Sequence, residues 1–280
     1  MLTICPTPIG NLSDASERQR EVLANADVIA CEDTRVTGKL LELLGIARTD
    51  GIPRLWRLDD HNEESQVVSL LDAVREGKNV VLVSDAGTPC IADPGFRIVR
   101  AAAEAGISFD VLPGANAAIV ALVASGLPIQ SFVYAGFLPA KSAARQAEVI
   151  RHRKMGLTWV FYEAPHRLVD ALSDVTDVCG PDQPVFVGRE LTKLHQEYVH
   201  GPASNVLETF RSRDRVRGEC VVVVGASAQT KDETVSLERL VKVLDDAGCS
   251  PQQVKAIASQ LLGVAKSDAY SVLQSIKAQN

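Results

Sequence analysis

Short apolar runs alternate with helical segments over the first part of the chain. The apolar runs are rich in β-branched residues and predict strands at 2–7, 28–30, 54–58, 79–84 and 108–112. The segments between them repeat apolar residues every three or four positions and predict helices at 17–25, 38–44, 64–75 and 95–105. Such alternation predicts a mostly parallel sheet with helices packed on its faces.

The alternation is interrupted by a stretch rich in glycine and proline that runs from Pro113 to Pro139. We expect a domain boundary in this stretch, because glycine and proline disfavour the interior of helices and strands. A second α/β pattern follows, with predicted strands at 158–162, 184–187 and 219–224 and predicted helices at 143–153, 165–178 and 203–212.

The last fifty residues predict three short helices after a polar linker near 227–233. The middle helix has clear end signals: Ser250 as N-cap, Pro251 in the first turn, Gln253 to complete a capping box, and Gly263 after its end. A helix, a glycine turn and a helix outline a helix-turn-helix, but such tails are also common structural appendages. The predicted domains are 1–115, 116–230 and 231–280.

Composition narrows the class of protein. Apolar residues make up 46% and charged residues 23% of the 280 positions, as in ordinary globular chains. No apolar run approaches the ~20 residues of a membrane span, and the N-terminus lacks the features of a secretory signal. The six cysteines are scattered and the histidines show no metal-ligand spacing, so we expect reduced thiols, no metal site and a cytoplasmic location.

The charged residues that give the net charge of −6 are distributed unevenly along the chain. Residues 1–110 carry 11 basic and 18 acidic side chains, residues 111–230 carry 12 and 11, and the tail carries 6 and 6. Within 139–167 there are six basic residues against two acidic ones, which is compatible with a phosphate-binding patch or with a solvated surface.

Polar loops follow several predicted strands. The segment from Ser84 to Gly95 combines two carboxylates, two glycines and two prolines directly after a buried strand. In open α/β sheets, ligands bind at this edge, so we expect this loop to bind a ligand. The loop at 7–12 could equally bind a ligand or be an ordinary turn from strand to helix. Charges at 32–35, 162–167 and 189–193 also follow strands, and they could equally be helix caps or solvated faces. Dinucleotide, P-loop and nucleophile-elbow motifs are absent.

Taken together, these loops resemble those of the small-subunit ribosomal RNA methyltransferases of the tetrapyrrole (corrin/porphyrin) methylase superfamily. The resemblance rests on motifs that occur in order: TPIGNL (7–12), EDTR (32–35), HNE (61–63), VSDAGTP (83–89) with DPG (93–95), PG (113–114), GFLP (136–139), YE (162–163) with HR (166–167), and RELTK (189–193).

The resemblance implies two α/β domains with S-adenosylmethionine in the cleft between them, a helical C-terminal segment and a homodimer. It implies 2′-O-methylation of a cytidine in the decoding region of 16S rRNA, so the small ribosomal subunit is the expected partner. The residues expected to bind the cofactor are Pro8, Gly10, Ser84, Asp85, Ala86, Gly87, Thr88, Ala115, Ala117 and Tyr162.

Methyl transfer requires mainly in-line positioning, and a base could activate the ribose hydroxyl. By resemblance the candidates for the base are Asp33 and Glu163, with Arg35 and Lys193 orienting the phosphate or the hydroxyl. The residues expected to contact RNA are Arg35, His61, Lys141, Arg145, His166 and Arg167. Two other functions stay open: a methyltransferase acting on a small tetrapyrrole precursor, and a non-enzymatic RNA-binding module.

Overall fold

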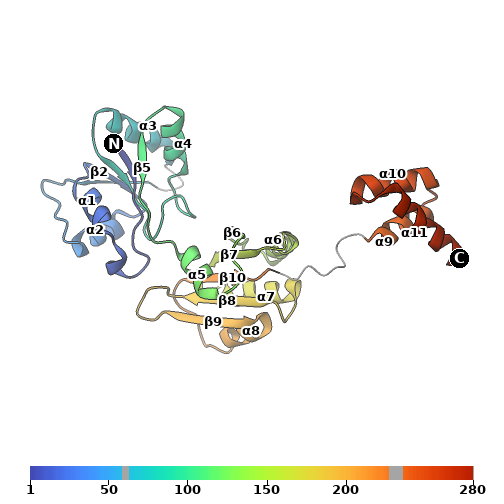
Figure 1. Cartoon of the computed structure of the whole chain (residues 1–280). Coiled ribbons are helices and arrows are strands. Elements are labelled where there is room, and N and C mark those ends of the chain that lie inside the picture. The colour runs from blue at the N-terminus through green and yellow to red at the C-terminus, as the bar shows by residue number, and fades with distance from the viewer. Residues whose placement is uncertain (59–62, 227–235, 280) are drawn as a thin grey trace. The chain divides into compact units, whose positions relative to one another are not determined.

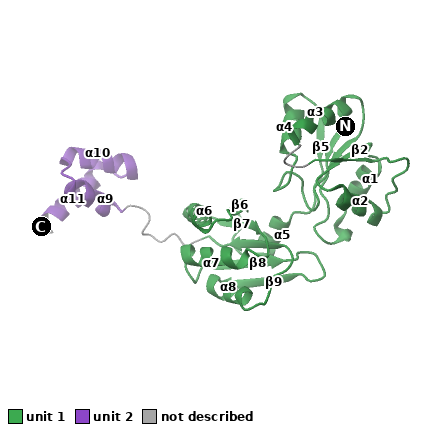
Figure 2. Cartoon of the chain, turned by 180° about the vertical axis from the view of Figure 1, so that it is seen from behind, with its two compact units in different colours: residues 1–227 green, residues 228–280 purple. Residues whose placement is uncertain are grey.

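Figure 1 shows the computed structural model, which describes residues 1–58, 63–226 and 236–279. The chain forms two compact units, residues 1–227 and residues 228–280, coloured green and purple in Figure 2. The first unit contains two five-stranded sheets, and the described residues of the second form three helices. Within the described ranges, no helix has the length and apolar character needed to cross a bilayer.

The first sheet is entirely parallel, with strand order β3-β2-β4-β1-β5. Its strands are β1 (Leu2–Ile4), β2 (Val28–Cys31), β3 (Arg54–Arg57), β4 (Val80–Leu82) and β5 (Phe109–Val111). The elements between them are η1 (Leu12–Asp14), α1 (Glu17–Ala24), α2 (Thr34–Leu43), α3 (Glu63–Arg75) and α4 (Phe96–Glu104). This arrangement confirms the parallel α/β pattern predicted for the first half.

Successive residues of the central strands point to opposite faces of this sheet, and both faces are buried. In β2, Val28 and Ala30 pack in one core cluster with α3 and α4, whereas Ile29 and Cys31 pack in another with α1 and α2. Strands covered on both sides are apolar at every position, which is why they appear in the sequence as continuous apolar runs.

The second sheet is mixed, with order β6-β7-β10-β8-β9, and β6–β7 is its parallel pair. Its strands are β6 (Phe132–Phe137), β7 (Thr158–Glu163), β8 (Pro184–Arg189), β9 (Glu197–Pro202) and β10 (Cys220–Val224). Helices α6 (Ser142–Lys154), α7 (Leu168–Cys179) and α8 (Ala203–Arg211) pack in the core cluster of one face, and α5 (Ala117–Ser125) packs in that of the other.

Three elements of this second half were missing from the sequence-based prediction. Helix α5 and strand β6 lie in the Gly/Pro-punctuated stretch that was expected to be only a boundary. Helix α5 is apolar almost throughout, so it has no amphipathic period to detect. Strand β9 is an edge strand that alternates between half-buried and exposed residues and ends in Gly-Pro, a sequence that resembles a loop.

The second unit is formed by α9 (Leu237–Asp246), α10 (Pro251–Leu262) and α11 (Lys266–Gln279) around Val241, Val254 and Leu273. The capping box of Ser250 and Gln253 is present, and Gly263 ends α10 in the left-handed conformation. These contacts confirm the predicted end signals. The α/β fold with helical tail is confirmed, while the predicted division at residues 115–116 stays a prediction.

Candidate active site

A cavity of about 460 Å³ lies at the carboxyl ends of the first sheet's strands and is closed by residues of the second sheet. Its position matches the edge at which open α/β sheets bind ligands. The lining residues are Ile9, Glu32, Asp85, Ala86, Gly87, Thr88, Ile91, Ala92, Asp93, Asn116, Ala117, Phe137, Tyr162, Glu163, Ala164, Pro165, Leu191, Glu219, Cys220 and Val221. The cavity therefore combines loops from both halves of the first unit.

Three loops of the first sheet are tied together around this cavity. The backbone groups of Thr7 and Gly87 exchange two hydrogen bonds of 2.8 and 3.0 Å. The Thr7 hydroxyl donates to the carbonyl of Ser84 at 3.1 Å, and the Thr88 hydroxyl donates to the carbonyl of Ala115 at 2.9 Å. Ser84 is buried and donates to the carbonyl of Gly87. The predicted residues Ser84 and Ala115 thus hold the loops in place, outside the cavity lining.

Glycine is required at Gly87 for two reasons. Its φ of +89° is in the region that side chains disfavour, and an added Cβ would lie 3.3 Å from the Ile9 side chain. The loop after β4 can consequently approach the loop after β1 closely enough to form one continuous cavity wall.

The loop between Thr88 and α4 contains two non-glycine residues with positive φ, Cys90 (+70°) and Ala92 (+66°). Its far end is fixed by Glu63, a buried carboxylate that accepts hydrogen bonds from the backbone N–H groups of Gly95 (3.0 Å) and Arg97 (2.8 Å). Such conformations persist where surrounding contacts enforce them, and they cluster at ligand sites. The sequence analysis did not identify this loop's Ile91, Ala92 and Asp93 as site residues.

Aromatic residues of the second sheet form the opposite wall. The Tyr162 ring makes edge contacts with Phe137 (5.7 Å between centroids) and with Tyr134 (5.5 Å). The Tyr162 hydroxyl accepts a hydrogen bond of 3.3 Å from the backbone N–H of Ala118, at the start of α5. Phe137 is 57% exposed although it is aromatic, as expected for a side chain that borders a ligand cavity.

The cavity is acidic. Its lining, among the residues that the structure describes, contains Glu32, Asp85, Asp93, Glu163 and Glu219 and neither lysine nor arginine. Burial raises the pKa of Asp85 above its ordinary value. An acidic, partly desolvated cavity favours a ligand with positive charge.

Two further cavities adjoin the first and share Asp85 with it. One, of about 500 Å³, is lined by Glu32, Asp33, Thr34, Arg35, Arg57 and Asp85. The other, of about 540 Å³, runs along α2 and is lined by Pro8, Asp33, Arg35, Val36, Lys39, Leu40, Leu43 and Asp85. The predicted residues Pro8, Asp33 and Arg35 therefore border these neighbouring cavities and not the main one.

Asp33 and Arg35 are paired with each other at the start of α2. The Arg35 guanidinium donates to both carboxylate oxygens of Asp33, with Nη2–Oδ2 at 2.5 Å and Nε–Oδ1 at 3.0 Å. Asp33 also caps the helix by accepting from the Arg35 backbone N–H at 2.8 Å. These hydrogen bonds from Arg35 hold the pKa of Asp33 well below its usual range. Arg35 itself has an 89% exposed side chain.

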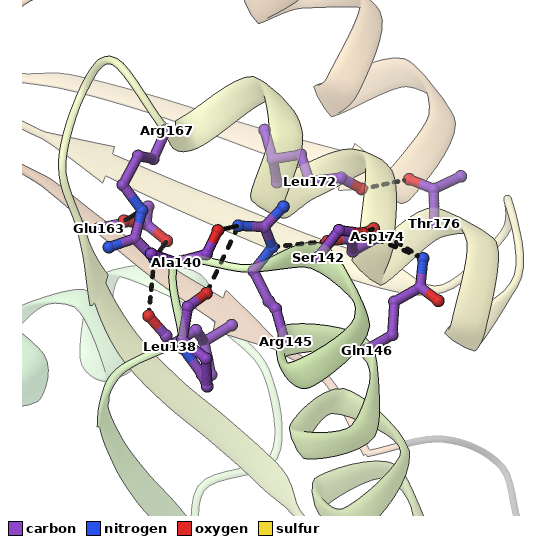
Figure 3. Close-up of polar contacts among 11 residues, drawn as sticks. Leu138, Ala140, Ser142, Arg145, Gln146, Glu163, Arg167, Leu172, Asp174 and Thr176 are labelled. Carbon is purple, nitrogen blue, oxygen red and sulfur yellow. Dashed lines mark hydrogen bonds and ion pairs between the residues drawn. The ribbon is translucent and has the colours of Figure 1, made fainter.

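The Glu163 carboxylate points toward Arg167 (Figure 3). Its side chain is fully buried, it accepts from the Ala164 backbone N–H at 2.9 Å, and Arg167 Nε lies 3.3 Å from Oε1. Burial raises the pKa of Glu163. Arg167 also donates to the carbonyl of Leu138 at 2.6 Å, so this pair holds the segment that follows Phe137.

Arg145, in the basic segment 139–167, lies inside the second domain and is 4% exposed (Figure 3). Its Nε donates to Asp174 at 2.6 Å, and its Nη1 donates to the carbonyls of Ala140 and Pro139. All these donors are used within the fold, so we leave Arg145 out of the proposed RNA surface. The sequence could not distinguish this buried arginine from a solvated one, because helix α6 carries basic residues around much of its circumference.

The other predicted residues lie in several places. Lys193 pairs with Glu190 (2.9 Å) and with Glu219 (3.1 Å), and Glu219 lines the main cavity. Lys141 and His166 are exposed, and His61 lies outside the described residues. Asp85, Ala86, Gly87, Thr88, Ala117 and Tyr162 line the main cavity, and so does Glu163.

Some further lining residues were not among the expected site residues, although they belong to the segments on which the resemblance rests. Glu32 belongs to the segment 32–35, Asp93 to the segment 93–95 and Phe137 to the segment 136–139. Within the ranges that the structure describes, no group of three or more metal-ligating side chains comes together.

Known proteins resemble this chain over most of its length. The profile of the tetrapyrrole (corrin/porphyrin) methylases matches residues 1–207. The chain is 44% identical over 272 residues to ribosomal RNA small subunit methyltransferase I of Escherichia coli O157:H7, covering 96% of this chain and 93% of the relative. The protein of the same name from Haemophilus influenzae is 38% identical, with 96% and 95% covered.

Solved structures show the same fold. The methyltransferase CobJ superimposes with a TM-score of 0.61 at 20% identity, covering 81% of this chain and 94% of CobJ. Uroporphyrin-III C-methyltransferase from Thermus thermophilus, complexed with S-adenosyl homocysteine, has a TM-score of 0.53 at 18% identity, with 81% and 98% covered. The chain therefore belongs to the tetrapyrrole (corrin/porphyrin) methylases and, among them, to the family of ribosomal RNA small subunit methyltransferase I.

Proposed function

We propose that this methyltransferase uses S-adenosylmethionine to methylate the 2′-hydroxyl of a cytidine in the decoding region of 16S rRNA. The observation that carries the proposal is the near full-length identity of 44% to a protein named ribosomal RNA small subunit methyltransferase I. The aligned region covers 96% of this chain, so it includes both sheets and most of the helical unit.

The main cavity fits S-adenosylmethionine in size and charge. Its volume of about 460 Å³ lies in the range typical of cofactor sites. The cofactor carries a sulfonium, an ammonium and a carboxylate, a net charge of +1, which suits a lining with five acidic residues and no basic one among those described. When bound, it supplies an electrophilic methyl group. The close-packed loops at Gly87 and Thr88 would fix the position of the bound cofactor. Tyr162 and Phe137 offer an aromatic surface for it to contact.

The neighbouring cavity at the start of α2 supports an RNA substrate. It carries the guanidinium groups of Arg35 and Arg57, which suit phosphate oxygens, beside the carboxylates of Asp33 and Asp85. Because this cavity shares Asp85 and Glu32 with the main one, a ribose held there would lie beside the methyl group. Positioning of this kind accounts for much of the rate in a transfer that needs no covalent enzyme intermediate.

A tetrapyrrole substrate is the rival function, and no feature of the site favours it. The structural neighbours that act on tetrapyrroles are 17–20% identical, a level that shows the common fold alone. Uroporphyrin-type precursors carry several carboxylates, which the acidic lining would repel. The homodimer and the cytoplasmic location stay predictions.

The test is to incubate the enzyme with methyl-labelled S-adenosylmethionine and small ribosomal subunits from a strain that lacks the enzyme. We expect label in 16S rRNA, at one cytidine, in an alkali-resistant linkage as a 2′-O-methyl group produces. Subunits that already carry the modification serve as the control. Label on a base, or label only in an added uroporphyrinogen, would contradict the proposal.

A further inference from the structure

We propose that Asp85 is the group that accepts the proton of the ribose hydroxyl during methyl transfer. The inference rests on the proposed function and adds a catalytic residue to it. By resemblance, Asp85 is expected among the cofactor-binding residues, and Asp33 or Glu163 is expected to be the base. The geometry points to Asp85 instead.

The position of Asp85 is the first argument. It follows β4, the central strand of the parallel sheet, and it lines all three cavities at this edge. The acidic cavity that suits the cofactor and the cavity with the two arginines both open onto its side chain. A base must reach both reactants, because the hydroxyl loses its proton while its oxygen attacks the methyl group.

The hydrogen bonding of Asp85 is the second argument. Its Oδ1 accepts from the backbone N–H of Asp33 at 3.1 Å, which fixes the orientation of the carboxylate. Among the residues that the structure describes, Oδ2 has no hydrogen-bond partner. One oxygen is thus held by the protein and the other is available to a substrate hydroxyl, as expected of a positioned base.

The other carboxylates near the cavities are engaged elsewhere. Asp33 is bound by Arg35 through both oxygens, which makes it a weak proton acceptor. Glu163 is fully buried against Arg167. Glu219 pairs with Lys193, and Glu32 and Asp93 have interactions of their own. Asp85 combines a place in all three cavities with a carboxylate oxygen that has no hydrogen-bond partner among the described residues.

The electrostatic surroundings agree with this role. The charged groups that line cavities together with Asp85 are Glu32, Asp33, Arg35, Lys39, Arg57, Asp93, Glu163 and Glu219. Burial, with a contribution from the negative charge of Asp33, raises the pKa of Asp85. A carboxylate with a raised pKa is a stronger base than an ordinary one.

The ribose O2′ forms a bond to the methyl carbon while the carbon–sulfur bond breaks, and the electron pair of that bond stays on sulfur, which becomes neutral. The hydroxyl proton passes to Oδ2 of Asp85 and then to water. No metal, oxidant or further reactant is needed.

The test compares Asp85→Asn and Asp85→Glu with the wild-type enzyme. Asparagine keeps an oxygen that can accept the Asp33 N–H but cannot take the proton. We expect the single-turnover rate of Asp85→Asn to fall about 100-fold or more, the range typical of a lost general base. Binding of S-adenosylhomocysteine, measured by calorimetry, and binding of the small subunit should change by less than about threefold. The Asp85→Glu variant should recover part of the rate.

The pH profile gives an independent readout. The wild-type rate should fall as pH decreases through the raised pKa of Asp85, because the protonated carboxyl cannot accept the proton. This acidic limb should disappear in Asp85→Asn. The exposed Asp72→Asn, which pairs with Arg75 on α3, controls for the loss of a surface charge.

The outcomes distinguish a failure of the assignment of Asp85 as the base from a failure of the proposed function. A wild-type rate in Asp85→Asn, or a large loss of S-adenosylhomocysteine binding, would overturn the assignment of Asp85 as the base. If the wild-type enzyme itself places no methyl group on 16S rRNA, the proposed function fails instead.

Discussion

Gly10 and Lys193 are in direct contact, although one follows the first strand of the first sheet and the other follows β8 of the second. A Cβ at Gly10 would lie 2.3 Å from Cγ of Lys193 and 2.9 Å from the Thr192 hydroxyl oxygen. The adjacent Ile9 packs in the core of the second sheet, in one cluster with Leu191. This contact fixes two loops that together border the main cavity.

Replacement of Gly10 by alanine should therefore weaken cofactor binding. The new methyl group has to displace the segment 191–193, including the backbone carbonyl of Leu191 at 3.2 Å. We expect the Kd for S-adenosylhomocysteine, measured by calorimetry, to rise by about tenfold, a loss of about 1.4 kcal/mol. Gly38→Ala, inside α2 and with no close neighbour, is the control and should be neutral or stabilising.

Lys193→Ala and Asp33→Ala should each abolish most of the methyl transfer while the cofactor still binds. Lys193 holds Glu190 and Glu219, and the Asp33 side chain positions Arg35. Methyl-transfer rates measured with labelled cofactor, and cofactor binding measured by calorimetry, would separate a loss of methyl transfer from a loss of cofactor binding. The exposed Lys78→Ala is the matched control. Wild-type rates in both variants would remove these two residues from the site.

Arg145→Ala should lower the stability of the fold strongly. Its effect on RNA contacts should be small. The substitution leaves Asp174 buried without its guanidinium partner, a change that costs about 3–5 kcal/mol. Chemical denaturation followed by circular dichroism would measure this loss. Arg151→Ala, on the same helix with an exposed partner, should cost less than about 1 kcal/mol. Equal losses in the two variants would contradict the buried ion pair.

Glu63→Ala should loosen the loop that carries Asp93. Two backbone N–H groups, those of Gly95 and Arg97, lose their acceptor, and an unsatisfied buried group costs about 1–3 kcal/mol. We expect a lower melting temperature and, because the loop lines the cavity, weaker binding of S-adenosylhomocysteine. Glu64→Ala, which removes an exposed carboxylate from the same turn, should change neither quantity appreciably.

Deletion of the helical unit should separate RNA binding from cofactor binding. The unit has its own core, and the cavity is lined entirely by residues of the first unit. A chain ending at residue 226 should bind S-adenosylhomocysteine with unchanged affinity and bind the small subunit more weakly in a filter-binding assay. Unchanged subunit binding would assign the helices a structural role.

The sequence by itself determined the parallel first sheet, the helical tail and the loops that carry the site. Continuous apolar runs such as 80–82 require burial on both faces, and the capping box at Ser250 is a local signal. The segments 84–88 and 162–163 were found because polar residues directly follow buried strands. Helix α5 and strand β9 escaped detection, because neither an apolar helix nor a half-polar edge strand has a distinctive period.

Only the tertiary structure decided what the individual charges do. Asp33, Asp85 and Glu163 are equivalent in sequence, each a carboxylate at or just beyond the end of a strand. Arg35 binds Asp33, Arg167 holds Glu163 in the interior, and Asp85 alone of these three keeps an oxygen at the junction of the cavities. The reason is physical: the role of a charge depends on its partners and its burial, and both are set by segments distant in the chain.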